Sequence, residues 1–220
     1  MVVSYKNRTV VNAAFGKANT QANIPASTSK LHRIASISKV FTKVAIKHLI
    51  SQARLSLDTK VFQDVFNYPS SQGSEHITVG DLLDHMVGCW PTTTRAEDPV
   101  FQKQSLTALQ LMKQTVSETD FTKDRKFLYS NFGYLVLGRL IEHVTGLPYL
   151  SYIKQLFSAI SVYQASNRVR PDETHYYSAS SQDDCYNMPL HRMDSCAGLL
   201  ATPVDLVKFL QLYCGDSSAE

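Results

Sequence analysis

Alternating apolar and polar residues at the start of the chain predict a β-hairpin. The segments 2–4 and 9–15 have the composition of short strands, and the polar sequence Tyr-Lys-Asn-Arg at 5–8 is typical of a tight turn between them. Gly16 is expected to close the second strand. Two strands alone bury too little surface to be stable in water, so we expect further strands from elsewhere in the chain.

The clearest helical pattern follows a polar passage that runs to about residue 32. Apolar residues recur every three or four positions across 36–52, which predicts an amphipathic helix with one buried face. The residues expected on that face are Val40, Phe41, Val44, Ala45, His48 and Leu49.

A capping pattern predicts a second, shorter helix after Thr78. The threonine hydroxyl can accept a hydrogen bond from the first turn, where Asp81 stands three residues further on. Gly88 is expected to end this helix. Its apolar face is expected to contain Leu82, Leu83 and Met86.

Helical periodicity also marks the middle of the chain. One helix is predicted after Ser105, a longer one over 131–145 that Gly146 ends, and a short one over 147–156. The long helix has its apolar residues at Leu135, Leu137, Leu140, Ile141 and Val144. Between 162 and 194 no period is visible, which indicates a loop with short strands.

The last predicted helix has a well-defined start. Thr202 is the expected cap, Pro203 occupies the first helical position and Asp205 lies in the first turn. Leu206, Phe209 and Leu210 are expected to face inward, and Gly215 to follow the end. A hairpin followed by a mainly helical body predicts one α+β domain over 1–220, with helices packed on an antiparallel sheet that is short of strands.

Composition limits the possible classes of protein. The 220 residues are 44% hydrophobic and 19% charged, which is ordinary for a globular protein with a sizeable core. The formal net charge is only +3 and the basic residues are scattered, so we expect no nucleic-acid partner. No apolar run reaches the ~18 residues of a membrane span, and the first residues lack a signal-peptide pattern. The compartment stays open.

The four cysteines follow no recognisable binding pattern. Cys89, Cys185, Cys196 and Cys214 contain no C-x-x-C pair and no metal-ligand spacing with the seven histidines. Free buried thiols are therefore favoured, with disulfides as the alternative, and neither a metal site nor a cofactor is predicted.

A candidate nucleophile lies at the start of the first helix. Residues 36–39 match S-x-x-K, a motif whose serine attacks the substrate, but 27–30 and 151–154 match it too. Only Ser36 opens a long amphipathic helix, in which Lys39 follows one turn later on the same face. The positive helix end favours an oxyanion and disfavours an ammonium, so Lys39 can act as a neutral base. The alternative is that Ser36 only caps the helix and Lys39 reaches solvent.

A second motif, Y-x-N, occurs at 129–131 and again at 5–7 in the predicted hairpin turn. Tyr129 directly precedes the long helix, where a phenol can face a cleft and relay a proton to a leaving group. The Asn131 amide can hold a substrate carbonyl or Lys39. The alternative is that Tyr129 packs in the interior and Asn131 caps the helix.

Five blocks in the same order as in a known family extend over nearly the whole chain. They are 33–42 with S-x-x-K, 55–58, 78–88, 129–138 with Y-x-N, and 197–205. Together they resemble the class C β-lactamases and their relatives among the serine β-lactamases and penicillin-binding proteins. The resemblance implies a β-lactamase/transpeptidase-like fold. It also implies hydrolysis of an ester or amide, since the relatives include D-alanyl-D-alanine peptidases, carboxylesterases and D-amino-acid amidases.

The resemblance also implies roles for individual residues. Ser36 would be acylated, Lys39 would assist its deprotonation, and Tyr129 would shuttle the proton. Asn131 would help to orient a small-molecule, peptide or ester substrate. Lys39 and Tyr129 would titrate as a coupled pair, so the sequence leaves open which of them is the base. His85 is interpreted as structural, because the base of this family is not histidine, and 89–104 are expected to border the cleft.

The third motif of the family has no match in this chain. That motif is a Lys or His followed one residue later by Gly, on a late strand that supplies the second oxyanion N–H. Losing one such donor typically costs about 10²–10³ in rate. We therefore expect either a fragment or shortened chain, or another group that fills the place of this strand. A sheet without its C-terminal strands would offer an open edge for self-association. Three hypotheses remain: a serine hydrolase, a non-catalytic scaffold, and an incomplete chain that is not stable alone.

Overall fold

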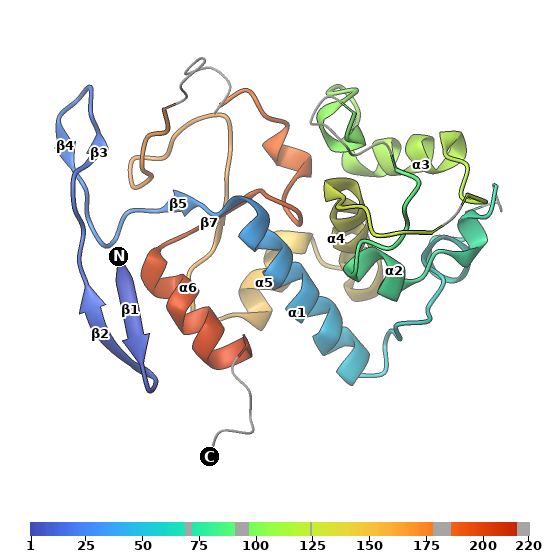
Figure 1. The fold of residues 1–220 in the computed structure, drawn as a ribbon, viewed down its shortest axis with the longest axis horizontal. Helices are drawn as coiled ribbons and strands as arrows, with labels where there is room; N and C mark the ends of the chain where they lie inside the picture. The colour runs from blue at the N-terminus through green and yellow to red at the C-terminus, as the bar shows by residue number, and fades with distance from the viewer. Residues whose placement is uncertain (69–71, 91–96, 124, 178–185, 215–220) are drawn as a thin grey trace.

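Helix α1 lies in the middle of the molecule, with the strands and α6 on one side of it and helices α2, α3 and α4 on the other (Figure 1). The computed structural model describes residues 1–68, 72–90, 97–123, 125–177 and 186–214. The strands are β1 (Val2–Tyr5), β2 (Arg8–Asn12), β3 (Lys17–Asn19), β4 (Ile24–Pro25), β5 (His32–Arg33), β6 (Tyr163–Gln164) and β7 (Leu199–Ala201). The α-helices are α1 (Ser38–Ser51), α2 (Val79–Leu83), α3 (Ala108–Glu118), α4 (Asn131–Thr145), α5 (Tyr149–Leu156) and α6 (Pro203–Phe209).

The N-terminal hairpin forms as predicted, with a shorter second strand. Strands β1 and β2 pair antiparallel, and the two turn residues Lys6 and Asn7 have φ of 46° and 59°, as a two-residue hairpin turn of type I′ requires. The prediction that the second strand reaches residue 15 is wrong. The Ala13 N–H donates to the Met1 carbonyl at 2.9 Å, and the residues after Ala13 lie beyond the end of the partner strand.

Two further sets of strands come from segments without a strand-like pattern. Strands β3 and β4 pair with each other, and β5, β7 and β6 form a separate antiparallel sheet in that order. All five are two or three residues long, too short to show an alternation that sequence inspection can detect. Strand β7 is central and completely buried, and it pairs with the segment that leads into Ser36. The third sheet therefore fixes the start of α1.

Helix α1 begins two residues later than predicted. A 3₁₀ turn, η1 (Ala35–Ile37), precedes it, so Ser36 lies in this turn and not in the α-helix. The expected inward positions Phe41, Ala45 and Leu49 are buried. Val40 was predicted on the same face but is exposed.

The capping box of α2 is confirmed, while its predicted length is wrong. Thr78 Oγ1 accepts from the Asp81 N–H at 3.1 Å, and Asp81 Oδ2 accepts from the Thr78 N–H at 2.9 Å. The helix ends at Leu83, well before Gly88, because the chain turns at His85, whose φ is 58°. Met86 therefore lies outside the helix and is exposed.

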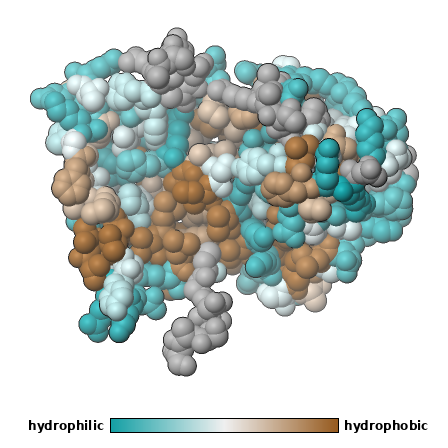
Figure 2. All heavy atoms as spheres, in the orientation of Figure 1, coloured by the Kyte–Doolittle hydropathy of each residue, from teal (hydrophilic) through white to brown (hydrophobic). Residues whose placement is uncertain are grey.

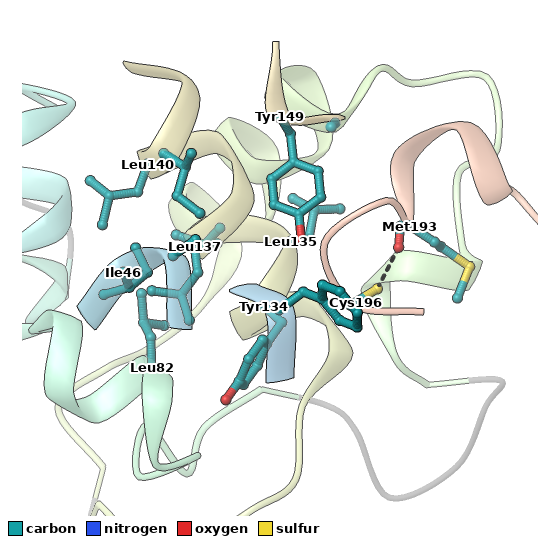
Figure 3. Packing of buried hydrophobic residues seen from close by; sticks show 14 of the residues in the cluster. Ile46, Leu82, Tyr134, Leu135, Leu137, Leu140, Tyr149, Met193 and Cys196 are labelled. Carbon is teal, nitrogen blue, oxygen red and sulfur yellow. Dashed lines mark hydrogen bonds between the residues drawn. The ribbon is translucent and has the colours of Figure 1, made fainter. Parts of the chain in front are cut away.

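The other predicted helices form, and α4 is the centre of the core. Helix α4 has the predicted bounds, and Gly146 ends it with φ of 72°. Ten consecutive residues, 132–141, are buried, so α4 is covered on all sides. Figure 3 shows its leucines Leu135, Leu137 and Leu140 among Ile46 of α1, Leu82 of α2 and Tyr149 of α5.

Helix α3 forms after Ser105 as predicted, and α6 starts at its predicted cap. Thr107 caps α3, and Thr202 Oγ1 accepts from the Asp205 N–H at 3.1 Å at the start of α6. Phe209 of α6 is buried and its ring stacks on Phe41 of α1, with ring centroids 3.9 Å apart. Leu210 was predicted to face inward but is exposed. The residue expected to follow this helix, Gly215, lies outside the described residues.

Two of the four cysteines can be described completely. Cys89 is half-buried and Cys196 is buried, and both are free thiols. Burial raises the pKa of the Cys196 thiol to about 12, and its Sγ donates to the Met193 carbonyl (Figure 3). Cys185 and the side chain of Cys214 lie outside the description. Over the described ranges, every helix is too short or too polar to cross a bilayer.

Candidate active site

The turn that holds Ser36 is tied to the buried sheet. The Ile34 N–H donates to the Leu199 carbonyl at 3.0 Å, directly after strand β5 pairs with β7. Ala35 then has a φ of 43°, a left-handed conformation that costs free energy in any residue except glycine. Ser38 Oγ accepts from the Leu199 N–H at 3.2 Å on the other side of the turn. The turn is held from both ends, and Ser36 is exposed between them.

Lys39 lies in the first turn of α1 with only 6% of its surface exposed. Its Nζ donates to three oxygens: Ser36 Oγ at 3.2 Å, Asn131 Oδ1 at 2.7 Å and the Cys196 carbonyl at 2.8 Å. It also lies 4.8 Å from the centre of the Tyr129 ring. The alternative that Lys39 reaches solvent is therefore wrong, because the amine is directed inward to a complete set of acceptors.

Tyr129 is the second side chain that contacts the Ser36 hydroxyl. Its Oη lies 2.7 Å from Ser36 Oγ, and 42% of the residue is exposed. The ring packs beside His85, with centroids 4.6 Å apart. Ser36 Oγ therefore lies within hydrogen-bond distance of both an amine and a phenol, and the residue is exposed to solvent. The structure thus brings together Ser36, Lys39, Tyr129 and Asn131, the four residues selected from the two motifs.

His85 packs against the Tyr129 ring and holds the segment that carries Tyr129. Its Nδ1 accepts from the Ser130 N–H at 3.1 Å, and its carbonyl accepts from the Leu128 N–H at 2.8 Å. Burial, helped by the charge of Lys39, lowers the pKa of His85 to about 4. The ring is therefore neutral near pH 7 and acts as an acceptor that fixes the approach to α4. This agrees with the interpretation of His85 as structural.

Asp98 is part of the cluster, and the sequence motifs do not include it. Its Oδ2 accepts from Asn131 Nδ2 at 2.9 Å and from the Asn131 N–H at 3.3 Å, while its Oδ1 accepts from the Val100 N–H at 3.0 Å. Only 3% of the residue is exposed, and this burial raises the pKa of its carboxyl group. Asp98 lies within 89–104, the segment expected to border the cleft, of which 91–96 fall outside the described residues.

The Cys196 carbonyl reaches Lys39 because its segment is held against α1 and α4. Thr42 Oγ1 donates to the Ser195 carbonyl at 2.7 Å, and Arg139 Nη2 donates to Asp194 Oδ2 at 2.6 Å. Gly138 of α4 makes the close approach possible, because a Cβ there would lie 2.3 Å from Ser195 Oγ. The glycine at position 138, inside the predicted helix 131–145, was the only feature of the sequence that indicated this close contact between α4 and Ser195.

The other copies of the motifs lie elsewhere. Ser27 Oγ bonds to Ser29 Oγ, and Lys30 Nζ donates to the Pro171 carbonyl, both at the surface. Residues 151–154 lie on α5, where Lys154 covers the Tyr163 ring. The Y-x-N copy at 5–7 forms the hairpin turn, as predicted. Tertiary structure thus distinguishes the three S-x-x-K matches.

The cluster is suited to nucleophilic chemistry by a hydroxyl group. A serine beside a buried amine and a phenol can lose its proton as it attacks a carbonyl carbon. Nowhere in the described ranges do three or more His, Cys, Asp or Glu side chains gather as metal ligands would.

The antiparallel sheets and the helical body around α4 define a β-lactamase/transpeptidase-like α+β fold. The family model described as Beta-lactamase matches residues 1–219. The chain therefore belongs to the Beta-lactamase family, as the collinear blocks indicate. A curated relative, the putative fimbrial assembly protein FimD (serogroup D) of Dichelobacter nodosus, is 28% identical over 155 residues. That match covers 69% of this chain and 39% of the relative.

Solved structures share the same fold. A penicillin-binding protein homologue from Pyrococcus abyssi, described as octameric, is 25% identical with a TM-score of 0.75, over 94% of this chain and 50% of that one. D-amino acid amidase from Ochrobactrum anthropi SV3, complexed with L-phenylalanine, is 25% identical with a TM-score of 0.72, over 89% and 58%. A class C beta lactamase from Rhodobacter sphaeroides is 18% identical with a TM-score of 0.69, over 96% and 59%. The chain thus spans little more than half of these structures.

Proposed function

We propose that this chain is a serine hydrolase that forms an acyl-enzyme on Ser36 with an ester or amide substrate. The observation that supports this most directly is that Ser36 Oγ lies 3.2 Å from Lys39 Nζ and 2.7 Å from Tyr129 Oη. A nucleophile within hydrogen-bond distance of two proton-transfer groups, and exposed to a substrate, is the geometry that acyl transfer needs. The 25% identity to an amidase supports an amide as one substrate class.

The reaction follows from these contacts. Ser36 Oγ attacks the substrate carbonyl carbon and its proton passes to Lys39 or Tyr129, both of which lie within hydrogen-bond distance of it. Collapse of the tetrahedral intermediate breaks the bond to the leaving group, whose oxygen or nitrogen takes up the proton through Tyr129. A water molecule then attacks the Ser36 ester by the reverse path and releases the acid.

The side-chain amide of Asn131 can form further hydrogen bonds to a substrate. Its Oδ1 accepts from Lys39 and its Nδ2 donates to Asp98, which uses one of the two oxygen lone pairs and one of the two N–H groups. The remaining N–H and lone pair can bind the acyl part of the substrate. Asn131 therefore both places Lys39 and helps to orient the substrate.

Covalent labelling tests the proposal. A fluorophosphonate probe should label the folded protein, and Ser36→Ala should remove the label. The control is Ser27→Ala, which changes the serine of an exposed S-x-x-K copy and should leave labelling unchanged. A folded wild-type protein that no fluorophosphonate or penicillin probe labels, or a Ser36→Ala variant that is still labelled, would disprove the proposal.

A second candidate function is self-association through the N-terminal strands. Val3, Tyr5 and Val10 of the hairpin are exposed, and Figure 2 shows hydrophobic residues gathered between this hairpin and α6. Exposed apolar patches of this kind favour association. The similarity to a penicillin-binding protein homologue described as octameric supports the same candidate.

Light scattering separates the two candidates. If the hairpin surface associates, Val10→Lys should lower the particle mass. Leu109→Lys, which replaces an exposed apolar residue of α3 on the other side of the molecule (Figure 1), should not. If the protein is a non-catalytic scaffold, its particle mass should also stay the same when Ser36 is replaced by alanine. A monomeric wild-type protein would rule out this candidate.

A further inference from the structure

The amide of Asn131 lies between a cation and an anion. Its Oδ1 is 2.7 Å from Lys39 Nζ, and its Nδ2 is 2.9 Å from Asp98 Oδ2. The negative end of the amide dipole thus faces the amine and the positive end faces the carboxylate. Rotating the amide by half a turn would set Nδ2 against Lys39 and Oδ1 against Asp98, which are two unfavourable contacts. The orientation of Asn131 is therefore determined from both ends.

Only a carboxylate satisfies all the partners of residue 98. The three groups that Asp98 meets, Val100 N–H, Asn131 N–H and Asn131 Nδ2, are all donors. An ionised carboxylate is an acceptor at both oxygens, whereas an asparagine presents an oxygen on one side and an NH₂ on the other. An asparagine at this position would direct its NH₂ at another donor, in a site where residue 98 is 3% exposed.

We propose that Asp98 is a positioning residue, which holds the Asn131 amide with its oxygen toward Lys39 and thereby places the Lys39 amine against Ser36. This inference rests on the proposed function of Ser36. Asp98 itself does not touch the serine in this arrangement and acts through Asn131. Its bond to the Asn131 N–H, at the N-terminus of α4, also lets its charge interact favourably with that helix dipole.

A competing explanation is that Asp98 serves only the local fold. It precedes the 3₁₀ turn η4 (Pro99–Phe101), and its Oδ1 caps that turn through the Val100 N–H. Asp98→Ser separates the two roles. Serine is a good cap and retains an acceptor for Val100, but it has no second oxygen directed at Asn131.

The experiment measures the rate constant of fluorophosphonate labelling at Ser36 for five proteins. They are the wild type, Asp98→Ser, Asn131→Ala, the Asp98→Ser/Asn131→Ala double variant and the control Asp84→Asn. Asp84 is an exposed aspartate that pairs with Lys43 of α1 at 3.3 Å, so its variant should react like the wild type. Thermal unfolding of each variant shows whether it is folded.

We expect Asp98→Ser to react up to about 100-fold more slowly, the order of loss that misplacing a reacting group causes. Because Asp98 acts through Asn131, the double variant should react within about twofold of Asn131→Ala. A folded Asp98→Ser variant that reacts at the wild-type rate would overturn the inference, as would effects that multiply in the double variant. If Asp98→Ser fails to fold while Asn131→Ala folds, Asp98 serves the fold, and the inference is also wrong.

Failure of the inference and failure of the proposed function give different results. If the wild type is labelled at Ser36 and only the Asp98 variants contradict expectation, the positioning role alone is lost. If the folded wild type is not labelled, the proposed function fails and the inference fails with it.

Discussion

Ser36 and Tyr129 are 93 residues apart in the chain, yet their side-chain oxygens lie 2.7 Å apart. Each comes from the residues that lead into a helix, η1 before α1 and the segment before α4. Helices α1 and α4 pack against each other in the core (Figure 3), so their two N-terminal ends meet. The pair thus depends on the packing of two helices rather than on any local motif.

Removing the Tyr129 hydroxyl should slow acylation without disturbing the packing. Tyr129→Phe keeps the ring beside His85 and Lys39 and removes only the oxygen that bonds to Ser36. Proton transfer by a positioned group typically contributes 10²–10⁴ in rate, so we expect labelling or turnover of an activated ester to fall by about that factor.

Tyr134→Phe is the matched control for this change. Tyr134 also lies near Lys39, with its ring centre 5.7 Å from Nζ, but its hydroxyl donates to the Leu83 carbonyl. Its loss should cost roughly 1 kcal/mol of stability and leave the acylation rate nearly unchanged. Equal rates for Tyr129→Phe and the wild type would show that the phenol carries no proton.

Gly138→Ala should destabilise the protein and slow acylation together. The new Cβ would lie 2.3 Å from Ser195 Oγ, in a helix buried on all sides, so the segment that presents the Cys196 carbonyl to Lys39 must move. Overpacking of this kind costs about 1–3 kcal/mol, which chemical denaturation measures as a lower midpoint at constant m.

Gly133→Ala tests whether the Gly138 effect comes from the close contact. Gly133 lies in the same helix, and a Cβ there would meet its nearest neighbours at 3.7 Å, an ordinary contact distance. Alanine is the better helix former by up to about 1 kcal/mol, so this variant should be as stable as the wild type or more stable. A Gly138→Ala variant as stable as Gly133→Ala would contradict the contact.

The half-buried ring of His85 should make stability depend on pH below neutrality. Its pKa in the folded state is about 4, below the ordinary histidine value of 6.5. Between those values the unfolded chain binds a proton that the folded chain does not. The free energy of unfolding should therefore be highest above pH 6.5 and decrease as the pH falls toward 4.

His85→Asn isolates this contribution. An asparagine Oδ1 can accept from the Ser130 N–H as Nδ1 does, and asparagine tolerates the φ of 58° at this position. We expect the melting temperature of this variant to change less between pH 7 and pH 5 than that of the wild type. An identical pH dependence in both proteins would mean that another group is responsible.

Local signals in the sequence were sufficient to predict that the helices form, although not where α1 begins or where α2 ends. Thr78, Thr202 and Gly146 mark helix ends through bonds and backbone angles that involve only nearby residues, and all three act as predicted. Periodicity was less reliable at single positions, because Val40 and Met86 have the apolar character of core residues and yet lie at the surface. An apolar residue is allowed at the surface, so pattern alone cannot exclude it.

The sequence by itself determined which residue types could form the site and where helices α2, α4 and α6 begin. It did not determine that Asp98 meets Asn131 or that the Cys196 carbonyl meets Lys39, because those partners are 33 and 157 residues apart. A short strand was expected within 162–194, where β6 forms, but the local pattern did not reveal β3, β4, β5 or β7, each of which is stabilised by pairing with another segment. Tertiary structure decided these contacts, since burying the face of one helix against another brings together polar groups that the local sequence does not relate.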